Sequence, residues 1–302
     1  MPAPAPIDAV YTWVDGARSD YVAEVRRHAA RPQDVNPERF RDAFDGLRYS
    51  LRSLERFAPW LRQVYLFTCR PQVPPWLRRD HPRLRIVHHD EVITEPGVLP
   101  TFNSNVIECF LDRLPGLSDR FVYLNDDYLL GGPVTTADFF TPDGRIRVAG
   151  TVAGERFRHR VYEHQWLSLG LLEHGPLLIE RRGWREMQAL APGEMRAHLQ
   201  HRFRAPDDLR PDRLYRWYML TRARDRAVAE PSWRYLRYAA FHKVRANPAA
   251  ERRALARLAA RRPRFLCLND DMGDTPDPTV VSLVRAYLET LCPEPSSFEQ
   301  RA

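Results

Sequence analysis

Residues 120–127 read Arg-Phe-Val-Tyr-Leu-Asn-Asp-Asp, and residues 264–271 read Arg-Phe-Leu-Cys-Leu-Asn-Asp-Asp. In each stretch a short apolar run with the character of a strand stops at an amide and two carboxylates. Ligands of open α/β sheets collect at the carboxyl ends of strands, so both acidic pairs are expected to face one crevice. The alternative for either copy is that Asn and Asp form a turn or cap a helix. Because the motif occurs twice, a binding role is favoured.

Strand and helix patterns alternate along the rest of the chain. Apolar runs predict strands at 7–14, 64–68, 84–87, 120–124 and 264–268. Periodic apolar positions and stop signals predict helices around Leu47, Leu51 and Leu54, and over 105–114, 251–261 and 279–291. Asn105 and Glu108 are spaced like a capping box at the start of the second of these helices. The alternation predicts an α/β fold built on a mostly parallel, doubly wound sheet.

The middle of the chain differs from the rest in amino-acid composition. Residues 151–262 are rich in Arg, Trp, Tyr and His and carry weak strand signals. We expect a single catalytic domain over 1–302, within which 151–262 is a mainly helical insertion or subdomain. The tail after Pro293 is expected to be loose.

Composition restricts the class of protein and of partner. With 302 residues and 44% hydrophobic content the chain can bury a large core. A net charge of +7 suits a polyanionic partner such as a nucleotide diphosphate, an acidic glycan, nucleic acid or an anionic membrane surface. Lys243 is the only lysine. The basic residues are dispersed along the sequence and no nucleic-acid recognition motif occurs, so nucleic acid is not the expected partner.

The four cysteines lie far apart, and the first residues lack a secretory apolar segment. No run of about 18 apolar residues occurs, so no transmembrane segment is expected. These features favour a cytoplasmic protein with free thiols, and leave peripheral association with the inner face of the membrane open. The phosphate-loop, dinucleotide-binding, zinc-protease and serine-hydrolase motifs are absent, which excludes the easily recognised members of those enzyme classes.

The acidic pairs are the main candidates for chemistry. Carboxylates beside an amide are hard oxygen donors that suit Mg²⁺ or Mn²⁺ in contact with a diphosphate. The predicted metal ligands are Asp126, Asp127, Asp270 and Asp271, with Asn125 and Asn269 beside them.

Other polar residues stand at predicted element ends. Asp15 follows the first strand, where it either binds a nucleotide or makes a simple Asp-Gly turn. Asn103 and Ser104 precede the predicted helix from Asn105, and their side chains could receive an anion together with the N–H groups of the first turn. The alternative is that Ser104 or Asn105 only caps the helix.

Four blocks resemble the Stealth family, the bacterial capsular-polysaccharide phosphotransferases related to the catalytic core of N-acetylglucosamine-1-phosphotransferase. The first block is residues 7–16, with Thr-Trp-Val-Asp-Gly at its end. The second runs from Arg41-Asp42 through Leu-Arg-Tyr-Ser at 47–50 to the acids at 126–127. The third holds His174, Pro176 and Arg204, and the fourth is residues 265–271.

The resemblance implies a nucleotide-sugar fold of the GT-A (Rossmann-like) kind. It implies transfer of a hexose-1-phosphate or N-acetylhexosamine-1-phosphate from a uridine diphosphate sugar, such as UDP-GlcNAc, to a glycan hydroxyl, with release of UMP. His174 becomes the candidate general base and Arg204 the cation that stabilises the transferring phosphate. Donor binding is expected from Asp15, Arg48, Arg52, Asn103, Ser104, Asn125 and Asn269.

Two other functions remain open from the sequence. A GT-A glycosyltransferase would use the same acids and the same donor but would transfer the sugar itself and release UDP. A basic protein that binds an anionic polymer would lose affinity steeply with salt and would not need Asp126 or Asp127.

Overall fold

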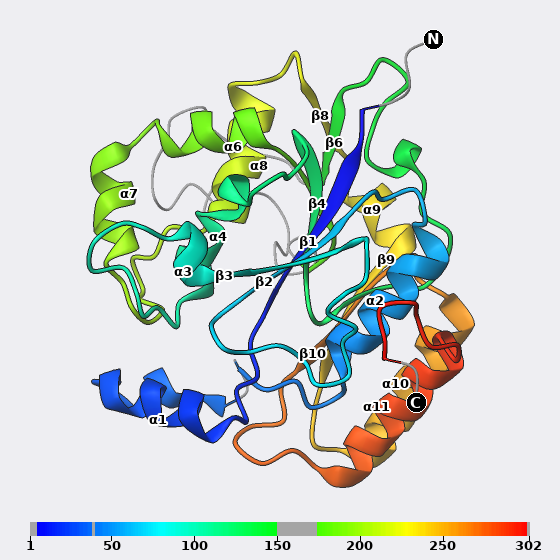
Figure 1. Cartoon of the computed structure of the whole chain (residues 1–302). Helices are drawn as coiled ribbons and strands as arrows, with labels where there is room; N and C mark the ends of the chain where they lie inside the picture. The colour runs from blue at the N-terminus through cyan, green and yellow to red at the C-terminus, as the bar shows by residue number, and fades with distance from the viewer. Residues whose placement is uncertain (1–4, 38–39, 150–173, 301–302) are drawn as a thin grey trace.

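The computed structural model describes residues 5–37, 40–149 and 174–300 (Figure 1). At its centre lies a five-stranded sheet in the order β3-β2-β1-β4-β7. Its strands are β1 (Ile7–Trp13), β2 (Val64–Thr68), β3 (Leu84–His88), β4 (Arg120–Asn125) and β7 (Leu177–Glu180). The first four strands run parallel, and β7 pairs antiparallel with β4. The prediction of an α/β fold with a mostly parallel sheet is confirmed.

The last predicted strand lies outside this central sheet. It is β10 (Phe265–Asp270), which pairs parallel with β9 (Ala239–Val244) and antiparallel with β5 (Tyr128–Leu130). Only Asp126 and Asp127 separate β4 from β5, so the chain passes from one sheet to the other at the first acidic pair. The β5–β10 pairing then brings the second copy of the motif beside the first. A third, two-stranded sheet joins β6 (Ile146–Ala149) to β8 (Ala227–Glu230).

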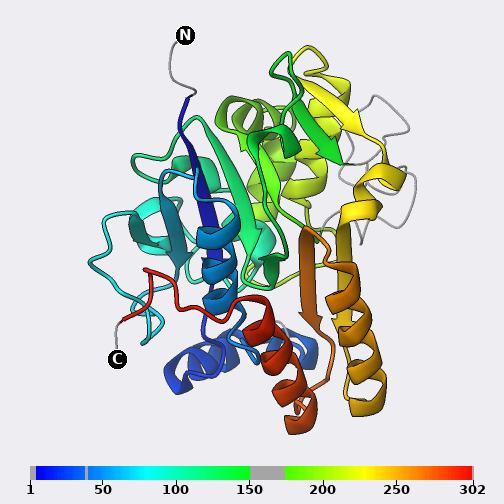
Figure 2. The ribbon, with the colours of Figure 1, turned by 90° about the vertical axis from the view of Figure 1, so that its right-hand side faces the viewer.

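Helices cover the strands on two sides (Figure 1). On one side lie α2 (Gly46–Phe57), α10 (Pro248–Arg261) and α11 (Pro278–Leu291), and on the other α3 (His89–Val92), α4 (Ser104–Glu108), α6 (Arg181–Gln188), α7 (Pro192–Leu199) and α8 (Pro211–Thr221). The other α-helices of the described residues are α1 (Ser19–His28) and α9 (Ser232–Tyr238). Figure 2 shows α10 and α11 lying side by side over the three-stranded sheet that contains β10. Within the described residues no helix has both the length and the apolar character needed to cross a membrane.

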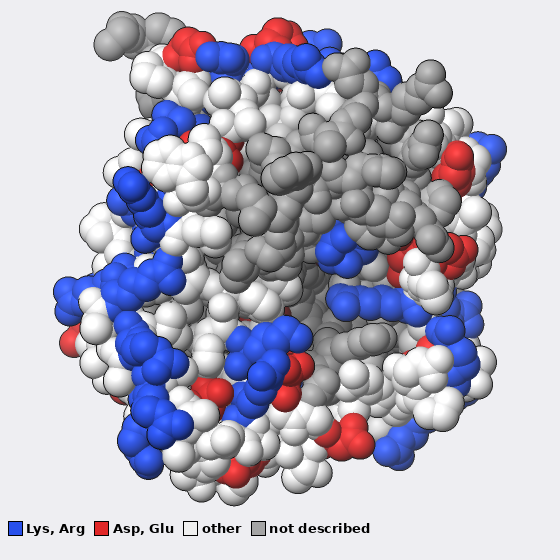
Figure 3. Space-filling model, turned by 180° about the vertical axis from the view of Figure 1, so that it is seen from behind, with Lys and Arg blue, Asp and Glu red and all other residues white. Residues whose placement is uncertain are grey.

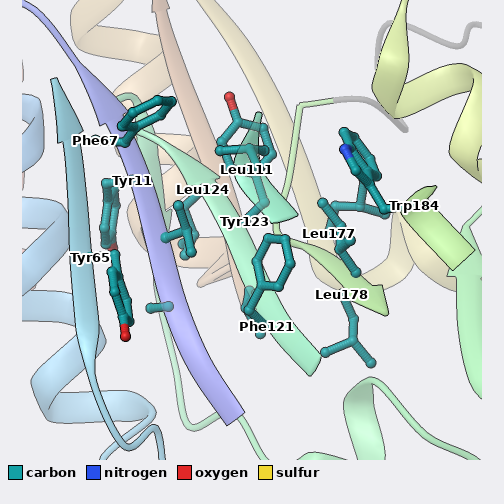
Figure 4. Packing of buried hydrophobic residues seen from close by; sticks show 14 of the residues in the cluster. Tyr11, Tyr65, Phe67, Leu111, Phe121, Tyr123, Leu124, Leu177, Leu178 and Trp184 are labelled. Atoms are coloured by element: carbon teal, nitrogen blue, oxygen red, sulfur yellow. The ribbon is translucent and has the colours of Figure 1, made fainter. Parts of the chain in front are cut away.

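The core follows from the apolar pattern of the sequence. Leu47, Leu51 and Leu54 of α2 are all buried, as their spacing predicts. The central strands bury aromatic side chains on both faces, which are drawn with their neighbours in Figure 4 and include Tyr11, Tyr65, Phe67, Phe121 and Tyr123. A strand of a parallel sheet that is covered on both faces needs such near-continuous apolar runs.

The helix predicted over 105–114 is shorter than expected. α4 ends at Glu108, and a separate 3₁₀ turn follows at Leu111–Arg113. The cap is neither Ser104 nor Asn105 but Asn103, whose side chain accepts a hydrogen bond from the backbone N–H of Asn105 at 3.1 Å. The predicted capping box of Asn105 and Glu108 is therefore wrong, because the side-chain amide of Asn105 donates instead to Asp208 at 3.2 Å.

The expected insertion, 151–262, lies partly outside the described residues. Its described part, 174–262, contains α6 to α10 and three strands, β7, β8 and β9. Each of these strands pairs with a strand from outside the segment, so the described part contributes to all three sheets. How the chain divides into domains stays a prediction.

The basic residues are less evenly dispersed than the sequence suggests. Arg252, Arg253, Arg257 and Arg261 are exposed on α10. Figure 3 shows Lys and Arg side chains forming a band along one edge of the molecule, where α10 lies. Elsewhere on that face basic and acidic side chains are mixed.

The tail after Pro293 is docked, which corrects the prediction that it is loose. Phe298 is fully buried, and Glu299 is 4% exposed. The Glu299 carboxylate accepts hydrogen bonds from Arg48 and from Arg52, whose Nε lies 2.7 Å from Glu299 Oε1. Among the described residues Glu299 is the nearest acidic partner of both arginines, and this long-range pairing, which local sequence patterns do not reveal, helps to hold the tail on α2.

We expect Glu299→Gln to destabilise the fold by about 3 kcal/mol at neutral pH, because it leaves the buried Arg52 without its main partner. Burial alone would raise the pKa of Glu299, but the arginines and the Ser296 N–H outweigh it and lower the pKa to about 2. Because the pKa is depressed on folding, this stability is present above the unfolded pKa near 4.5 and is lost as the pH falls toward 2. Urea unfolding at several pH values measures it.

The control is Glu289→Gln, because Glu289 also contacts Arg52 but its side chain is 53% exposed. Its effect is expected to stay below about 1 kcal/mol. An equal loss in both variants, or a Glu299→Gln effect that does not change with pH, would contradict the prediction.

Candidate active site

A cavity of about 540 Å³ opens where β1, β4 and β10 end. Both copies of the acidic motif line it, so the two sheets present their acids to one space. Nine of the residues predicted from the sequence lie on its wall: Ser104, Asn125, Asp126, Asp127, His174, Arg204, Asn269, Asp270 and Asp271. Lys243, the single lysine, also lines it.

The second acidic pair is already neutralised by basic side chains. Arg41 Nε donates to Asp270 Oδ2 at 2.6 Å. Lys243 and Arg245 lie 3.5 and 3.2 Å from the carboxylate of Asp271. These carboxylates therefore have counter-ions within the chain.

The first acidic pair is different. Among the described residues, no Lys or Arg forms an ion pair with Asp126 or Asp127. Asp127 Oδ1 is buried without a hydrogen-bond partner in that part of the chain, while Oδ2 receives Asn269 Nδ2 at 3.4 Å and Cys267 Sγ at 3.2 Å. A buried carboxylate oxygen without a partner is costly in an empty protein and is suited to a cation.

A third acid, Asp42, adds to this concentration of negative charge. Burial raises the pKa of Asp42 to about 6, although the Gly46 N–H donates to its carboxylate. Burial also raises the pKa of Asp126 well above its ordinary value, and the charges of Asp42 and Asp127 add to that rise. Carboxylates that repel one another in a buried cavity gain most from a divalent cation. Asp42 stands at the start of the second block of resemblance, and its place in the sequence predicted no role for it.

Gly46 explains how Asp126 comes so close to α2. A Cβ atom at position 46 would lie 2.9 Å from the carbonyl oxygen of Asp126, so any larger residue would displace that backbone. The start of α2 and the acidic turn are therefore packed against each other without a side chain between them.

The donor set fits the divalent metal implied by the sequence. Asp126 and Asp127 offer oxygen atoms, the ligands that Mg²⁺ and Mn²⁺ prefer. The unpartnered Oδ1 of Asp127 is the observation that supports a cation at this place. Asp270 and Asp271 fit less well because Arg41, Lys243 and Arg245 occupy their carboxylates.

His174 stands beside the first acidic pair. Its ring stacks on Phe241 of β9, with centroids 4.0 Å apart and planes at 10°. It lies with Asp127 and Cys267 in a group whose potential ligand atoms are all within 4.8 Å of one another. Burial lowers the pKa of His174, and the charge of Asp127 opposes that shift. Its buried Nδ1 has no hydrogen-bond partner in the described chain.

Arg204 reaches the cavity from the loop that follows α7. Its Nη2 donates to Ser104 Oγ at 2.6 Å. The loop is tied to the segment before α4, because Phe203 stacks on Phe102 and the Phe102 N–H donates to the Arg202 carbonyl at 2.8 Å. The guanidinium and the first turn of α4 thus face the same space.

Residues 39–148 match the model of Stealth protein conserved region 2, and residues 256–302 match that of Stealth protein conserved region 4. The chain belongs to the Stealth family. The first matched region contains the first acidic pair, and the second matched region contains the second acidic pair.

Several relatives in this family are named exopolysaccharide phosphotransferases. One from Streptomyces coelicolor is 36% identical over 320 residues, which is 98% of this chain and 53% of the relative. One from Nocardia farcinica is 32% identical, covering 97% of this chain and 61% of the relative. CpsY of Mycobacterium tuberculosis is 29% identical, covering 98% and 58%. The chain thus spans little more than half the length of these Stealth relatives.

Two solved structures that are similar to this chain are named as glycosyltransferases. The galactosyltransferase LgtC has a TM-score of 0.44 at 14% identity, covering 94% of this chain and 95% of its own. GlyE of Streptococcus pneumoniae has a TM-score of 0.44 at 12% identity, covering 95% and 62%.

Four residues predicted to bind the donor do not line the cavity of this Stealth chain. Arg48 and Arg52 bind Glu299, and we leave them out of the proposed site. Asp15 Oδ1 accepts the Ala17 N–H at 2.9 Å, which is the turn alternative. Asn103 is fully buried, where it caps α4 and donates to Asp208 at 2.8 Å.

The side-chain amides of Asn125 and Asn269 form hydrogen bonds within the protein. Asn125 Oδ1 lies 2.7 Å from the Tyr123 hydroxyl, and its Nδ2 donates to the Tyr128 hydroxyl at 3.2 Å. Asn269 donates to Asp127, as described above. These contacts orient the turn, so the amides support the acids in addition to facing the cavity.

Proposed function

We propose that this chain is a phosphotransferase that moves hexose-1-phosphate, or N-acetylhexosamine-1-phosphate, from a uridine diphosphate sugar to a hydroxyl of a glycan. The product is a phosphodiester, and UMP is released. The observation that carries the proposal is that one cavity combines two half-buried acids, Asp126 and Asp127, with His174 and Arg204, and that these acids have no basic ion-pair partner among the described residues. The names of the Stealth relatives support phosphate transfer to an exopolysaccharide.

A divalent ion, Mg²⁺ or Mn²⁺, would be held by Asp126 and Asp127, with Asp42 contributing charge nearby. When bound, it supplies charge neutralisation at the diphosphate of the donor. Asn269 and Cys267 fix the other oxygen of Asp127 in place.

His174 is proposed as the general base. Since burial lowers its pKa, the imidazole is neutral near pH 7, and because His174 lines the cavity, the ring can take the proton of the acceptor hydroxyl. The hydroxyl oxygen then forms a bond to the phosphorus that carries the sugar. The bond from that phosphorus to the bridging oxygen of UMP breaks, and the electron pair leaves with UMP.

Arg204 is proposed to stabilise the negative charge on the transferring phosphate. Phosphoryl transfer depends mainly on positioning and on neutralising charge, which a guanidinium held by Ser104 provides. Ser104 also begins α4, but this helix is too short to act as an anion site without Arg204.

The released nucleotide tests the proposal against its nearest rival. Purified protein is incubated with uridine diphosphate sugars, Mg²⁺ or Mn²⁺ and glycan acceptors, and the nucleotides are separated by chromatography. We expect acceptor-dependent UMP, abolished by a chelator and restored by metal. Release of UDP instead would make the chain a glycosyltransferase.

A second candidate function is binding of an anionic polymer, favoured by the exposed arginines of α10. It predicts affinity that falls steeply with salt and that survives Asp126→Ala together with Asp127→Ala. This surface can also serve an enzyme whose acceptor is acidic.

Location in the cytoplasm and contact with the inner face of the membrane stay predictions.

A further inference from the structure

A second group of metal-binding side chains lies outside the proposed catalytic cavity. It consists of His198 at the end of α7, with His201 and Asp208 in the loop that follows. None of the three lines the cavity of the acidic motifs. Their potential ligand atoms lie within 4.8 Å of one another.

The Asp208 carboxylate is the centre of this group. Its Oδ1 lies 2.8 Å from His201 Nδ1 and 3.3 Å from His198 Nδ1. Its Oδ2 is held by Asn103 Nδ2 at 2.8 Å, Asn105 Nδ2 at 3.2 Å and the Ala205 N–H at 3.1 Å. These three donors leave Oδ1 directed at the two imidazoles.

His198 is not explained by the fold alone. Its side chain is 1% exposed, yet within the described residues neither ring nitrogen makes a hydrogen bond. A buried imidazole normally hydrogen-bonds through at least one nitrogen, whereas here Nδ1 has only the ion-pair contact with Asp208 and Nε2 has no hydrogen-bond partner among the described residues. The Nδ1 atom nonetheless faces Asp208 Oδ1 at a distance too short for an intervening water.

We infer that His198 Nδ1, His201 Nδ1 and Asp208 Oδ1 bind a transition-metal ion, with Zn²⁺ as the best match. Two imidazoles and one carboxylate are a usual zinc ligand set, whereas Mg²⁺ and Ca²⁺ prefer oxygen alone. Ligand atoms around a tetrahedral zinc lie roughly 3.3 Å apart, close to the spacing around Asp208. The asparagines and Ala205 act as the outer donors that orient a ligating carboxylate.

The site would fasten the loop that carries Arg204. His201 and Asp208 stand on either side of Arg204 in the sequence, and His198 belongs to α7. An ion bound to all three joins the helix to both ends of the loop while Asn103 links it to the cap of α4. The side chain of His201 is 26% exposed, so this edge of the group is in contact with solvent.

Zinc binding by the whole chain tests this inference. The protein, with any polyhistidine tag removed, is stripped by a chelator, titrated with Zn²⁺ and analysed for bound metal. We expect one zinc per chain and a rise in Tm of about 5 °C at saturating Zn²⁺. In His201→Ala the affinity is expected to fall at least about 100-fold and the rise in Tm to disappear.

The matched control is His174→Gln, because Asp127, His174 and Cys267 form the other group of possible ligands. Zinc uptake that persists in His174→Gln and is lost in His201→Ala supports the inference. Circular dichroism of His201→Ala checks that this variant folds. Asp208→Asn removes a second proposed ligand with little change in side-chain shape. No uptake by the wild type, or uptake lost in His174→Gln and retained in His201→Ala, overturns it. The result does not depend on the catalytic proposal, since no turnover is measured.

Discussion

Asp127→Asn is expected to lower kcat/KM for sugar-phosphate transfer by about 10³-fold. The substitution keeps the size of the side chain but removes the charge of a buried carboxylate whose Oδ1 has no partner in the described chain. Loss of several kcal/mol of charge stabilisation in the transition state corresponds to that factor. Steady-state kinetics with saturating Mn²⁺ measures the change, and electron paramagnetic resonance of Mn²⁺ reports metal binding separately.

Asp271→Asn is the matched control, because it makes the same chemical change in the other copy of the motif. Lys243 and Arg245 already neutralise Asp271, so its loss is expected to cost less than about tenfold. If both variants lose activity and Mn²⁺ binding equally, the two acidic pairs hold the metal together and the distinction drawn from their ion pairs is wrong.

His174→Gln is expected to lower kcat by roughly 10²- to 10⁴-fold, the usual contribution of a general base. The glutamine amide can still pack on Phe241, so the shape of the cavity is largely kept while the proton acceptor is lost. The KM for the nucleotide sugar is expected to change little, because His174 acts on the acceptor. Single-turnover kinetics with the donor bound in advance measures this step.

His242→Gln serves as the control for His174→Gln. His242 is next to Phe241 on β9, pairs with Glu251 and does not line the cavity. It is expected to leave kcat within about twofold of the wild type, with an effect on stability only. A loss of less than tenfold in His174→Gln would remove His174 from the role of base.

Much of the fold could be predicted because its signals are local. Apolar runs gave the five strands to within a few residues, and the leucine spacing gave α2. The length of the second predicted helix could not be read in this way. α4 ends at Glu108 and a 3₁₀ turn follows, and Asn105, predicted to start a capping box, binds Asp208 instead, a contact between residues 103 positions apart.

The sequence alone determined which residues are available for chemistry: two Asn-Asp-Asp turns at strand ends, a histidine and an arginine. Only the tertiary structure distinguishes the two turns by their ion pairs. Arg41 reaches Asp270 across 229 positions, Asp126 and Asp127 receive no such partner among the described residues, and Arg48 and Arg52 are taken by Glu299. Strand and helix signals depend on neighbours within a few residues. Burial and ion pairing depend on groups that meet only when the chain is folded, and these decide which carboxylate remains free to bind a ligand.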